Sequence, residues 1–385
     1  MQITGIICEY NPLHLGHQKQ MNMIRSQIGS DSGIVCLMSG NFVQRGHPAI
    51  LDKMTRAKAA VECGADLVLE MPVGAALSSA EGFAASGVSI LSRICNRLCF
   101  GAEDAECASI MDIAKALLAP EFSPALRLEL EKGLSFPAAR QKALEAIGVH
   151  AALLEKPNNI LAVEYCKAIL AQNSAMTPMP ICREGSYHDT AVDRENPSAT
   201  AVRQLMVAQE NWLDYIPEKA QPWVANGTIH RLKWGEKTIL YRLRTMTDEE
   251  FEALPYGSEG LWRKLMHASR AAASLEEIID APKSKRYTRS RIDRMIMCAF
   301  LGLRAEDLCS PVPYCRVLAF NDQGRAILKN AKDSGFFVNI GTDTKHPYQQ
   351  IERRVTALYG LFAQQEEAPD GEEKYRVYYK KGECL

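Results

Sequence analysis

Short apolar runs alternate with longer, helix-length patterns along the first half of the chain. The runs are rich in Ile, Val, Leu and Met and end in turn signals, which predicts strands at 3–10, 33–40, 65–72, 97–103 and 178–185. Helical patterns lie between and around them, at 14–28, 51–63, 79–92, 104–118, 136–147 and 158–172. Strands that are apolar on both faces and separated by helices are typical of a parallel sheet covered on both sides. The pattern therefore predicts an α/β fold with a doubly wound, Rossmann-like parallel sheet.

The pattern changes near residue 205. Segment 212–310 is mostly helix-like, whereas 314–342 has a strand–helix–strand pattern, followed by a helical pattern at 347–363 and a polar tail with a short strand signal. A chain of 385 residues is too long for one ordinary core. We therefore expect three regions: an α/β domain at 1–208, a mostly helical, basic region at 209–310 and a small α/β region at 311–385.

The composition is that of an ordinary globular protein, with 47% hydrophobic and 24% charged residues. The net charge of −1 creates no overall field that would attract nucleic acid or a membrane, so any such contact needs a local patch. No apolar stretch approaches the roughly 20 residues of a membrane span, and no signal-peptide pattern follows Met1. We expect a cytoplasmic protein without membrane contact.

The twelve cysteines include no C-x-x-C pair, and several lie within or beside apolar runs. This placement favours small buried side chains in a reducing compartment over disulfides or a zinc site.

The first strand ends in a stretch that carries candidate chemistry, EYNPLHLGHQKQ at 9–20. His14 and His17 could share a metal, but no third ligand accompanies them. They could also simply cap a helix. A phosphate site explains more of the residues, because Pro12 favours a turn, a helix starting near His14 points its free N–H groups at the strand end, and Gly16 permits close approach. HLGH resembles the H-x-G-H signature of the nucleotidyltransferase superfamily.

A second motif follows the fifth strand, in NPSATAVRQLM at 196–206. Ser198, Thr200 and Arg203 are similar to the S-x-T-x-x-R motif of the same superfamily. Hydroxyls and a guanidinium at a helix N-terminus suit the β- and γ-phosphates of a nucleotide. An ordinary N-cap would account for Ser198 alone.

Basic residues cluster near the end of the helical region, in KSKRYTRSRIDR at 283–294. With Tyr287 interleaved, this composition suits RNA phosphates and a stacked base, although a solvated helix face has the same appearance. The candidate RNA-binding residues are Lys283, Lys285, Arg286, Arg289, Arg291 and Arg294.

Several motifs occur together and in order: EYNPLHLGH, SGNFVQRGHPAILDKMTRAKAAVECGADLVLEMPV, FGAE, KPNNILAVEY, SATAVR and RYTRSRIDR. Together they resemble the bacterial tRNA(Met) cytidine acetate ligase family. Two positions depart from the family pattern, Leu13-His14-Leu15 in place of Phe-His-Asn and His47 in place of Glu, and the second leaves the role of its loop open. The resemblance implies that ATP, with Mg²⁺, activates acetate as acetyl-adenylate. The acetyl group then passes to N4 of the wobble cytidine in elongator tRNA(Met).

The resemblance also implies site residues. The ATP segment would comprise Ile7, Cys8, Glu9, Tyr10, Asn11, Pro12, Leu13, His14, Leu15, Gly16, His17, Gln18, Lys19 and Gln20, with His14 and His17 as the catalytic pair. Gly101, Asn158, Arg183, Ser198, Thr200 and Arg203 would complete the nucleotide site, and the loop of Gln44 and Arg45 would approach the substrate. A turn glycine, a helix N-cap and a surface salt bridge remain alternatives for Gly101, Asn158 and Arg183.

Two other functions remain open. A nucleotidyltransferase that adenylylates a small-molecule cofactor precursor would not need the basic region, and a non-enzymatic, nucleotide-sensing RNA-binding protein would not need both histidines.

Overall fold

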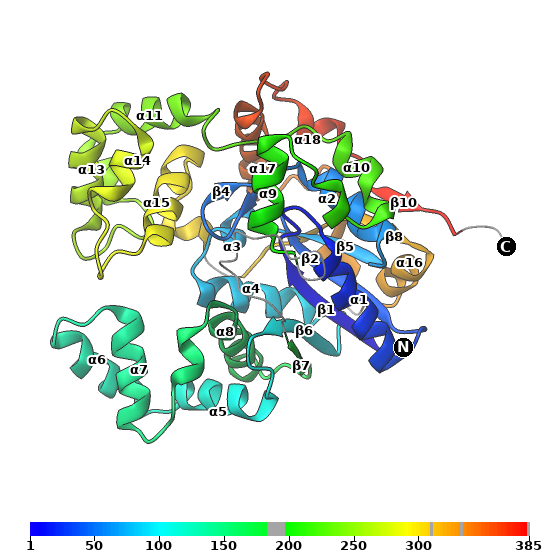
Figure 1. Cartoon of the computed structure of the whole chain (residues 1–385), viewed down its shortest axis with the longest axis horizontal. Coiled ribbons are helices and arrows are strands. Elements are labelled where there is room, and N and C mark those ends of the chain that lie inside the picture. Colours follow the sequence, from blue (N-terminus) through cyan, green and yellow to red (C-terminus); the bar gives the residue numbers. More distant parts are fainter. Residues whose placement is uncertain (183–196, 309–310, 332–333, 383–385) are drawn as a thin grey trace.

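A computed structural model describes residues 1–182, 197–308, 311–331 and 334–382 (Figure 1). The strands are β1 (Ile3–Cys8), β2 (Gly33–Ser39), β3 (Phe42–Val43), β4 (His47–Pro48), β5 (Leu67–Met71), β6 (Arg97–Ala102), β7 (Thr177–Cys182), β8 (Cys315–Asn321), β9 (Phe337–Asn339) and β10 (Tyr378–Lys380). The helices of the first half are α1 (Leu15–Ile28), α2 (Lys53–Glu62), α3 (Val73–Ala76), α4 (Ala80–Leu91), α5 (Cys107–Leu118), α6 (Phe122–Glu131), α7 (Phe136–Ala146) and α8 (Pro157–Ala171).

The later helices are α9 (Ala199–Ala208), α10 (Gln221–Ala225), α11 (Glu236–Thr245), α12 (Asp248–Glu252), α13 (Leu261–Ala271), α14 (Leu275–Asp280), α15 (Arg289–Leu301), α16 (Asp322–Lys329), α17 (Pro347–Tyr359) and α18 (Gly371–Lys374). Among the described residues, no helix is both long and apolar enough to cross a bilayer.

The main sheet has the strand order β10-β8-β5-β2-β1-β6-β7, and β9 pairs with β8. The five strands predicted from the apolar runs form its parallel part, β5-β2-β1-β6-β7. This confirms the doubly wound α/β fold. The order reverses at β1, because the chain passes from β1 to β2 on one side and later to β6 on the other.

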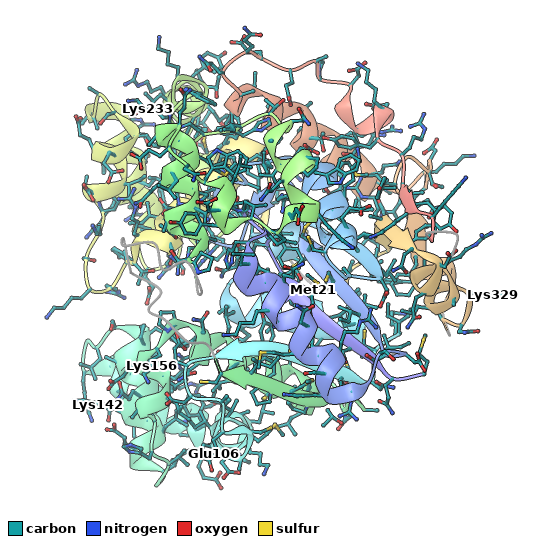
Figure 2. The ribbon with its side chains drawn as sticks, turned by 45° about the vertical axis from the view of Figure 1, so that its right-hand side comes forward. Met21, Glu106, Lys142, Lys156, Lys233 and Lys329 are labelled. Carbon is teal, nitrogen blue, oxygen red and sulfur yellow. The ribbon has the colours of Figure 1, made fainter. Side chains whose placement is uncertain are left out.

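Both faces of the sheet are buried, as the apolar strands predict. Along β2, Val35 and Leu37 join one core with α4, α5 and α8, whereas Ile34, Cys36 and Met38 join a second core with α1 and α2. Met21 of α1 is buried, whereas charged side chains such as Lys142 and Lys329 project outward (Figure 2). A third core holds α11, α13, α14, α15 and α17 together.

Helix α6 was not predicted, and neither were the short helices α3 and α18. The only buried residue of α6 is Phe122, whereas its Leu128 and Leu130 side chains are exposed.

The C-terminal strands extend the same sheet. Strand β8 pairs antiparallel with β5, and β9 and β10 pair parallel with β8. Region 311–385, expected as a small α/β unit, thus shares its hydrogen bonding with the first domain, while the boundaries at 208 and 310 stay predictions.

A buried guanidinium holds the carboxyl ends of β1 and β2 together. Arg56 of α2, only 1% exposed, donates from Nη1 to the carbonyl oxygens of Glu9 at 2.7 Å and Ser39 at 3.0 Å. Its Nε donates to Leu51 at 2.9 Å, and Nη2 donates to Gly40. These carbonyls have their donors although the strands have ended, which places the loops after β1 and β2 in a defined position.

A buried ion network joins the C-terminal segment to the first domain. Lys53 of α2 lies 3.0 Å from Glu70 of β5 and 2.7 Å from Glu372 of α18. Arg316 of β8 lies 2.8 Å from Glu70 and 3.0 Å from Glu352 of α17, and it also pairs with Glu372. Three carboxylates face two cations, so a network with every group ionised carries one excess negative charge.

We expect this excess charge to make stability depend on pH. Desolvation raises the pKa of Glu352 to about 7, which outweighs the attraction of Arg316. The folded chain then holds the proton of the Glu352 carboxyl more tightly than the unfolded chain does. The contribution of this protonation to the free energy of unfolding is complete below the unfolded pKa of about 4.5 and is lost as pH rises through 7. Glu352→Gln should remove about 1–3 kcal/mol of this pH dependence between pH 5 and 8.

Urea unfolding of both proteins at several pH values measures the difference. Identical slopes of unfolding free energy against pH would contradict the assignment, because the other titrating groups are common to both proteins.

Candidate active site

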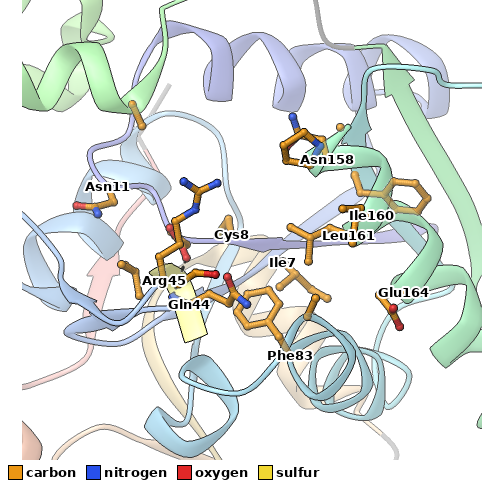
Figure 3. Close-up of a pocket in the computed structure, with 18 of the residues that line it drawn as sticks. Ile7, Cys8, Asn11, Gln44, Arg45, Phe83, Asn158, Ile160, Leu161 and Glu164 are labelled. Carbon is orange, nitrogen blue, oxygen red and sulfur yellow. Dashed lines mark hydrogen bonds between the residues drawn. The ribbon is translucent and has the colours of Figure 1, made fainter. Parts of the chain in front are cut away.

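A cavity of about 1590 Å³ opens at the carboxyl end of the parallel strands, beside the reversal of strand order at β1. Open α/β sheets bind ligands at this position. Its walls come from the β1–α1 turn, the β3–β4 hairpin, α4, α7, α8, and the first turns of α9 and α15. Figure 3 shows part of this lining, with Cys8 near its centre, Arg45 and Asn11 on one side and Ile160 and Leu161 on the other.

His14 and His17 are arranged by the start of α1. His14 is the N-cap residue, and its Nδ1 accepts a hydrogen bond from the Gly16 N–H at 3.1 Å. The Nδ1 atom of His17 accepts from the His14 N–H at 3.2 Å, and the two rings stack with centroids 3.7 Å apart. An Nδ1 that accepts carries no proton, so each neutral ring holds its proton on Nε2. The helix-capping interpretation is therefore correct for the Nδ1 atoms, and in this tautomer the N–H of each ring is at Nε2.

The start of α9 lies against the start of α1. Ser198 caps α9 by accepting from the Ala201 N–H at 3.1 Å. Arg203 donates to Thr200 Oγ1 at 3.0 Å and to the Asn11 carbonyl at 2.6 Å, which ties α9 to the end of β1. The two predicted motifs, 180 residues apart, thus meet in space, and the positive ends of two helix dipoles converge.

Gly16 lies in this contact. An added Cβ would lie 3.0 Å from the His14 ring and 3.9 Å from the carbonyl oxygen of Pro197. A side chain here would press on the ring of His14. The close approach predicted for Gly16 is therefore made by this ring.

Not every residue of the predicted ATP segment lines the cavity. The lining residues are Ile7, Cys8, Glu9, Tyr10, Asn11, His14, Gly16, His17, Lys19 and Gln20. Pro12, Leu13, Leu15 and Gln18 are not among them, and Leu13 belongs to the core between α1 and the sheet. A helical turn has two faces, and only one can face a ligand.

Gly101 and Asn158 form the side of the cavity next to β6. Gly101 pairs with Ile181 of β7, and Asn158 lies in the first turn of α8. The Asn158 amide donates to Glu103 at 2.7 Å, and Glu103 also accepts the backbone N–H groups of Asn158 and Asn159. Glu103 therefore caps α8 from another element, a role that no local pattern could reveal. Arg183 lies outside the described residues.

The β3–β4 hairpin brings Gln44 and Arg45 to the cavity, a position that the spacing of residues in the sequence does not predict. The Gln44 N–H donates to the Glu9 carboxylate at 2.9 Å. Gly46 has a φ of 80°, and a Cβ there would lie 2.6 Å from the Arg294 backbone nitrogen, so the hairpin rests directly on α15. His47, where the family pattern has Glu, lies 3.4 Å from the Asp293 carboxylate. This contact places His47, which differs from the family pattern, between the β3–β4 hairpin and α15.

The six basic residues near α15 have different surroundings. Arg289 and Arg294 line the cavity. Arg289 pairs with Glu276 and Asp293, while Arg294 is buried with its guanidinium 5.1 Å from the Tyr256 ring centre. The other four, Lys283, Lys285, Arg286 and Arg291, are absent from the lining, and Arg286 and Arg291 both pair with Glu259. Acidic residues distant in sequence thus neutralise part of the basic run.

Comparisons with known proteins agree with this geometry. The model of a family described as HIGH Nucleotidyl Transferase matches residues 1–374. A Clostridium novyi protein named tRNA(Met) cytidine acetate ligase is 40% identical over 352 residues, which cover 86% of this chain and 88% of that protein. A protein of the same name from Clostridium perfringens strain SM101 is 38% identical over 94% of this chain and 95% of its own length.

Two crystal structures of Thermotoga maritima TmcAL, each 28% identical, cover 99% of this chain and all of theirs. The apo form superimposes with a TM-score of 0.92, and the form bound with alpha-thio ATP superimposes with 0.87. These matches confirm the resemblance that the motifs indicate. This chain belongs to the tRNA(Met) cytidine acetate ligase family of HIGH nucleotidyl transferases.

Proposed function

We propose that the protein uses ATP to activate acetate as acetyl-adenylate and transfers the acetyl group to N4 of the wobble cytidine in elongator tRNA(Met). The observation that carries this proposal is the meeting of the α1 and α9 N-termini in a cavity whose far wall is the start of α15. The names of the relatives and the alpha-thio ATP in one TmcAL structure support it.

In the first step, an acetate oxygen attacks the α-phosphorus of ATP, and the bond to the departing pyrophosphate breaks. The Nε2–H groups of His14 and His17 donate to phosphate oxygens as negative charge moves onto the leaving group. Arg203 and the α9 N-terminus, with Ser198 and Thr200, bind the β- and γ-phosphates. The positive ends of the two helix dipoles add to this stabilisation.

In the second step, the N4 amine of cytidine attacks the acetyl carbonyl carbon, AMP leaves with the bonding electron pair, and N4 releases a proton. The amine is a weak nucleophile because its lone pair is delocalised into the ring, so a mixed anhydride is a suitable donor. No acyl-enzyme is needed. Burial raises the pKa of the Cys8 thiol, which lines the cavity, well above its usual value and keeps that thiol protonated.

Mg²⁺ would accompany ATP. Within the described residues, no group of three or more His, Cys, Asp or Glu is placed to hold a metal. The ion would therefore be bound through phosphate oxygens and water, as Mg²⁺ often is. Because its substrates are ATP and tRNA, we infer that the enzyme works in the cytoplasm.

We expect His17→Ala to reduce acetate-dependent exchange of pyrophosphate into ATP by about 10²–10³-fold, because one preorganised donor to the phosphates is lost. Circular dichroism should show an unchanged fold. His267→Ala, an exposed histidine outside the cavity, is the matched control and should exchange at the wild-type rate. Wild-type exchange by the His17 variant would refute the phosphate role.

The whole reaction is tested with isotopically labelled acetate, ATP and bulk bacterial tRNA that lacks the modification. Mass spectrometry of the digested tRNA should find label in N4-acetylcytidine only when ATP is present. Transfer of AMP to a small molecule without any label in tRNA would instead favour the cofactor-forming transferase.

The start of α15, which forms the basic wall of the cavity, gives a separate prediction. Arg289→Gln should weaken tRNA binding and reduce the slope of log K against log salt by about 0.7, while ATP affinity stays unchanged. Arg286→Gln should have a smaller effect, since Arg286 does not line the cavity.

Arg304→Gln is the control, because Arg304 is exposed and does not line the cavity. Equal salt slopes for Arg289→Gln, the control and the wild type would move the RNA surface elsewhere.

A further inference from the structure

An exposed aromatic side chain stands in the cavity wall opposite the basic helix. Phe136 is 55% exposed and lines the cavity. Among the described residues, Tyr241 is the other aromatic in the strongly exposed class, at 72%, and it is not part of the cavity lining. A phenyl ring left in water contributes little to folding, so its place at the active-site cavity calls for a ligand.

Phe136 belongs to a helical hairpin formed by α6 and α7. These helices pack mainly against each other and project at one side of the molecule, away from α13–α15 (Figure 1). Leu128 and Leu130 of α6 and Leu118 at the end of α5 are also exposed. The exposed apolar side chains of the described chain are therefore concentrated in this part of the fold.

The ring is held in place by the start of α7. Ser135 is the N-cap residue, Pro137 occupies the first turn, and the Ala139 N–H donates to the Ser135 carbonyl at 2.8 Å. One turn later, the buried guanidinium of Arg140 donates to Glu164 at 3.1 Å and lies 6.0 Å from the Phe136 ring centre. Arg140 Nε is buried and has no hydrogen-bond partner among the described residues, and Arg140 also lines the cavity.

The opposite wall is polar and basic. Thr288, Arg289 and Ser290, at the start of α15, line the same cavity, and His14 and His17 line it at the end of β1. A ligand on Phe136 would thus lie between the start of α15, which is suited to phosphates, and the two histidines, where the adenylate is proposed to form. A flat apolar ring beside cationic donors, facing a basic wall, matches an unpaired base of a single-stranded nucleic acid. An apolar protein segment would have no use for the basic wall.

We propose that Phe136 is a stacking platform for an unpaired base of the RNA substrate. The stacked base holds the anticodon loop at the cavity mouth while the target cytidine reaches the acetyl group. The inference deepens the proposed function and rests on it for the identity of the RNA. Phe136 acts by positioning the RNA and takes no part in the chemistry at phosphorus.

The test uses the full chain and two readouts. The first is the affinity for an anticodon stem–loop RNA, measured by fluorescence anisotropy, and the second is kcat/KM for acetyl transfer to tRNA. Phe136→Ala should lower both by about 5- to 100-fold, the range expected when one base loses its stacking partner. Acetate-dependent exchange of pyrophosphate into ATP should stay at the wild-type rate.

Two further variants sharpen the result. Phe136→Trp keeps a stacking face and should bind the RNA at least as well as the wild type, whereas Phe136→Leu keeps an apolar side chain and should lose most of the affinity. Tyr241→Ala, the matched exposed aromatic outside the cavity, should change none of the three measurements.

Unchanged RNA affinity in Phe136→Ala would overturn the proposal, as would equal affinity in the Trp and Leu variants. A changed oligomeric state with unchanged RNA binding would assign the apolar side chains to a protein contact instead. Failure of the wild type to exchange pyrophosphate with acetate would refute the proposed function, while the RNA affinity still decides the role of Phe136.

Discussion

The site depends on one buried guanidinium that has backbone carbonyls as its partners. Arg56 donates to the chain where β1 and β2 end and where the next loops begin. Carbonyl groups at that edge have left the sheet, and burying them without donors would cost free energy. Arg56 supplies the donors from a helix on one face of the sheet. Further bonds extend the effect: Asn11 Oδ1 accepts from the Ile50 N–H, and the Asn11 carbonyl accepts from Arg203. The β1–α1 turn, the β3–β4 hairpin and α9 therefore share one framework.

The histidine pair shows how a structural bond can set up chemistry. Each Nδ1 is used in capping α1, so each proton is placed on Nε2, and the stacked rings hold the two donors side by side. Capping uses the Nδ1 atoms, whereas the proposed phosphate contact would use Nε2, so the two interpretations do not compete for the same atoms. The ring orientation is thus determined by bonds to backbone N–H groups at the start of α1.

The cavity is shaped by elements that lie far apart along the chain. One wall carries residues from β6 and α8, a second is the basic start of α15, and a third is the α6–α7 hairpin with its exposed ring. The hairpin of Gln44 and Arg45 rests on α15, so the phosphate end and the basic wall are in direct contact. The buried network of Lys53, Arg316 and three carboxylates ties the C-terminal strands to the same sheet. Residues from the first α/β domain and from the helical region thus share one cavity.

Local patterns by themselves determined the parallel strands, most helices and the histidine turn, because apolar periodicity and the N-P-x-H-x-G-H stretch act over a few residues. Only the tertiary structure decided the rest. The antiparallel addition of β8 beside β5 depends on pairing across some 250 residues. Glu103 caps a helix that starts 54 residues later, and Glu259 and Glu276 neutralise arginines in another element. The exposure of Phe136 depends on how the α6–α7 hairpin packs, which no local pattern reveals. Contacts between residues distant in sequence can be identified only from the tertiary structure, since they depend on distance and burial and not on sequence spacing.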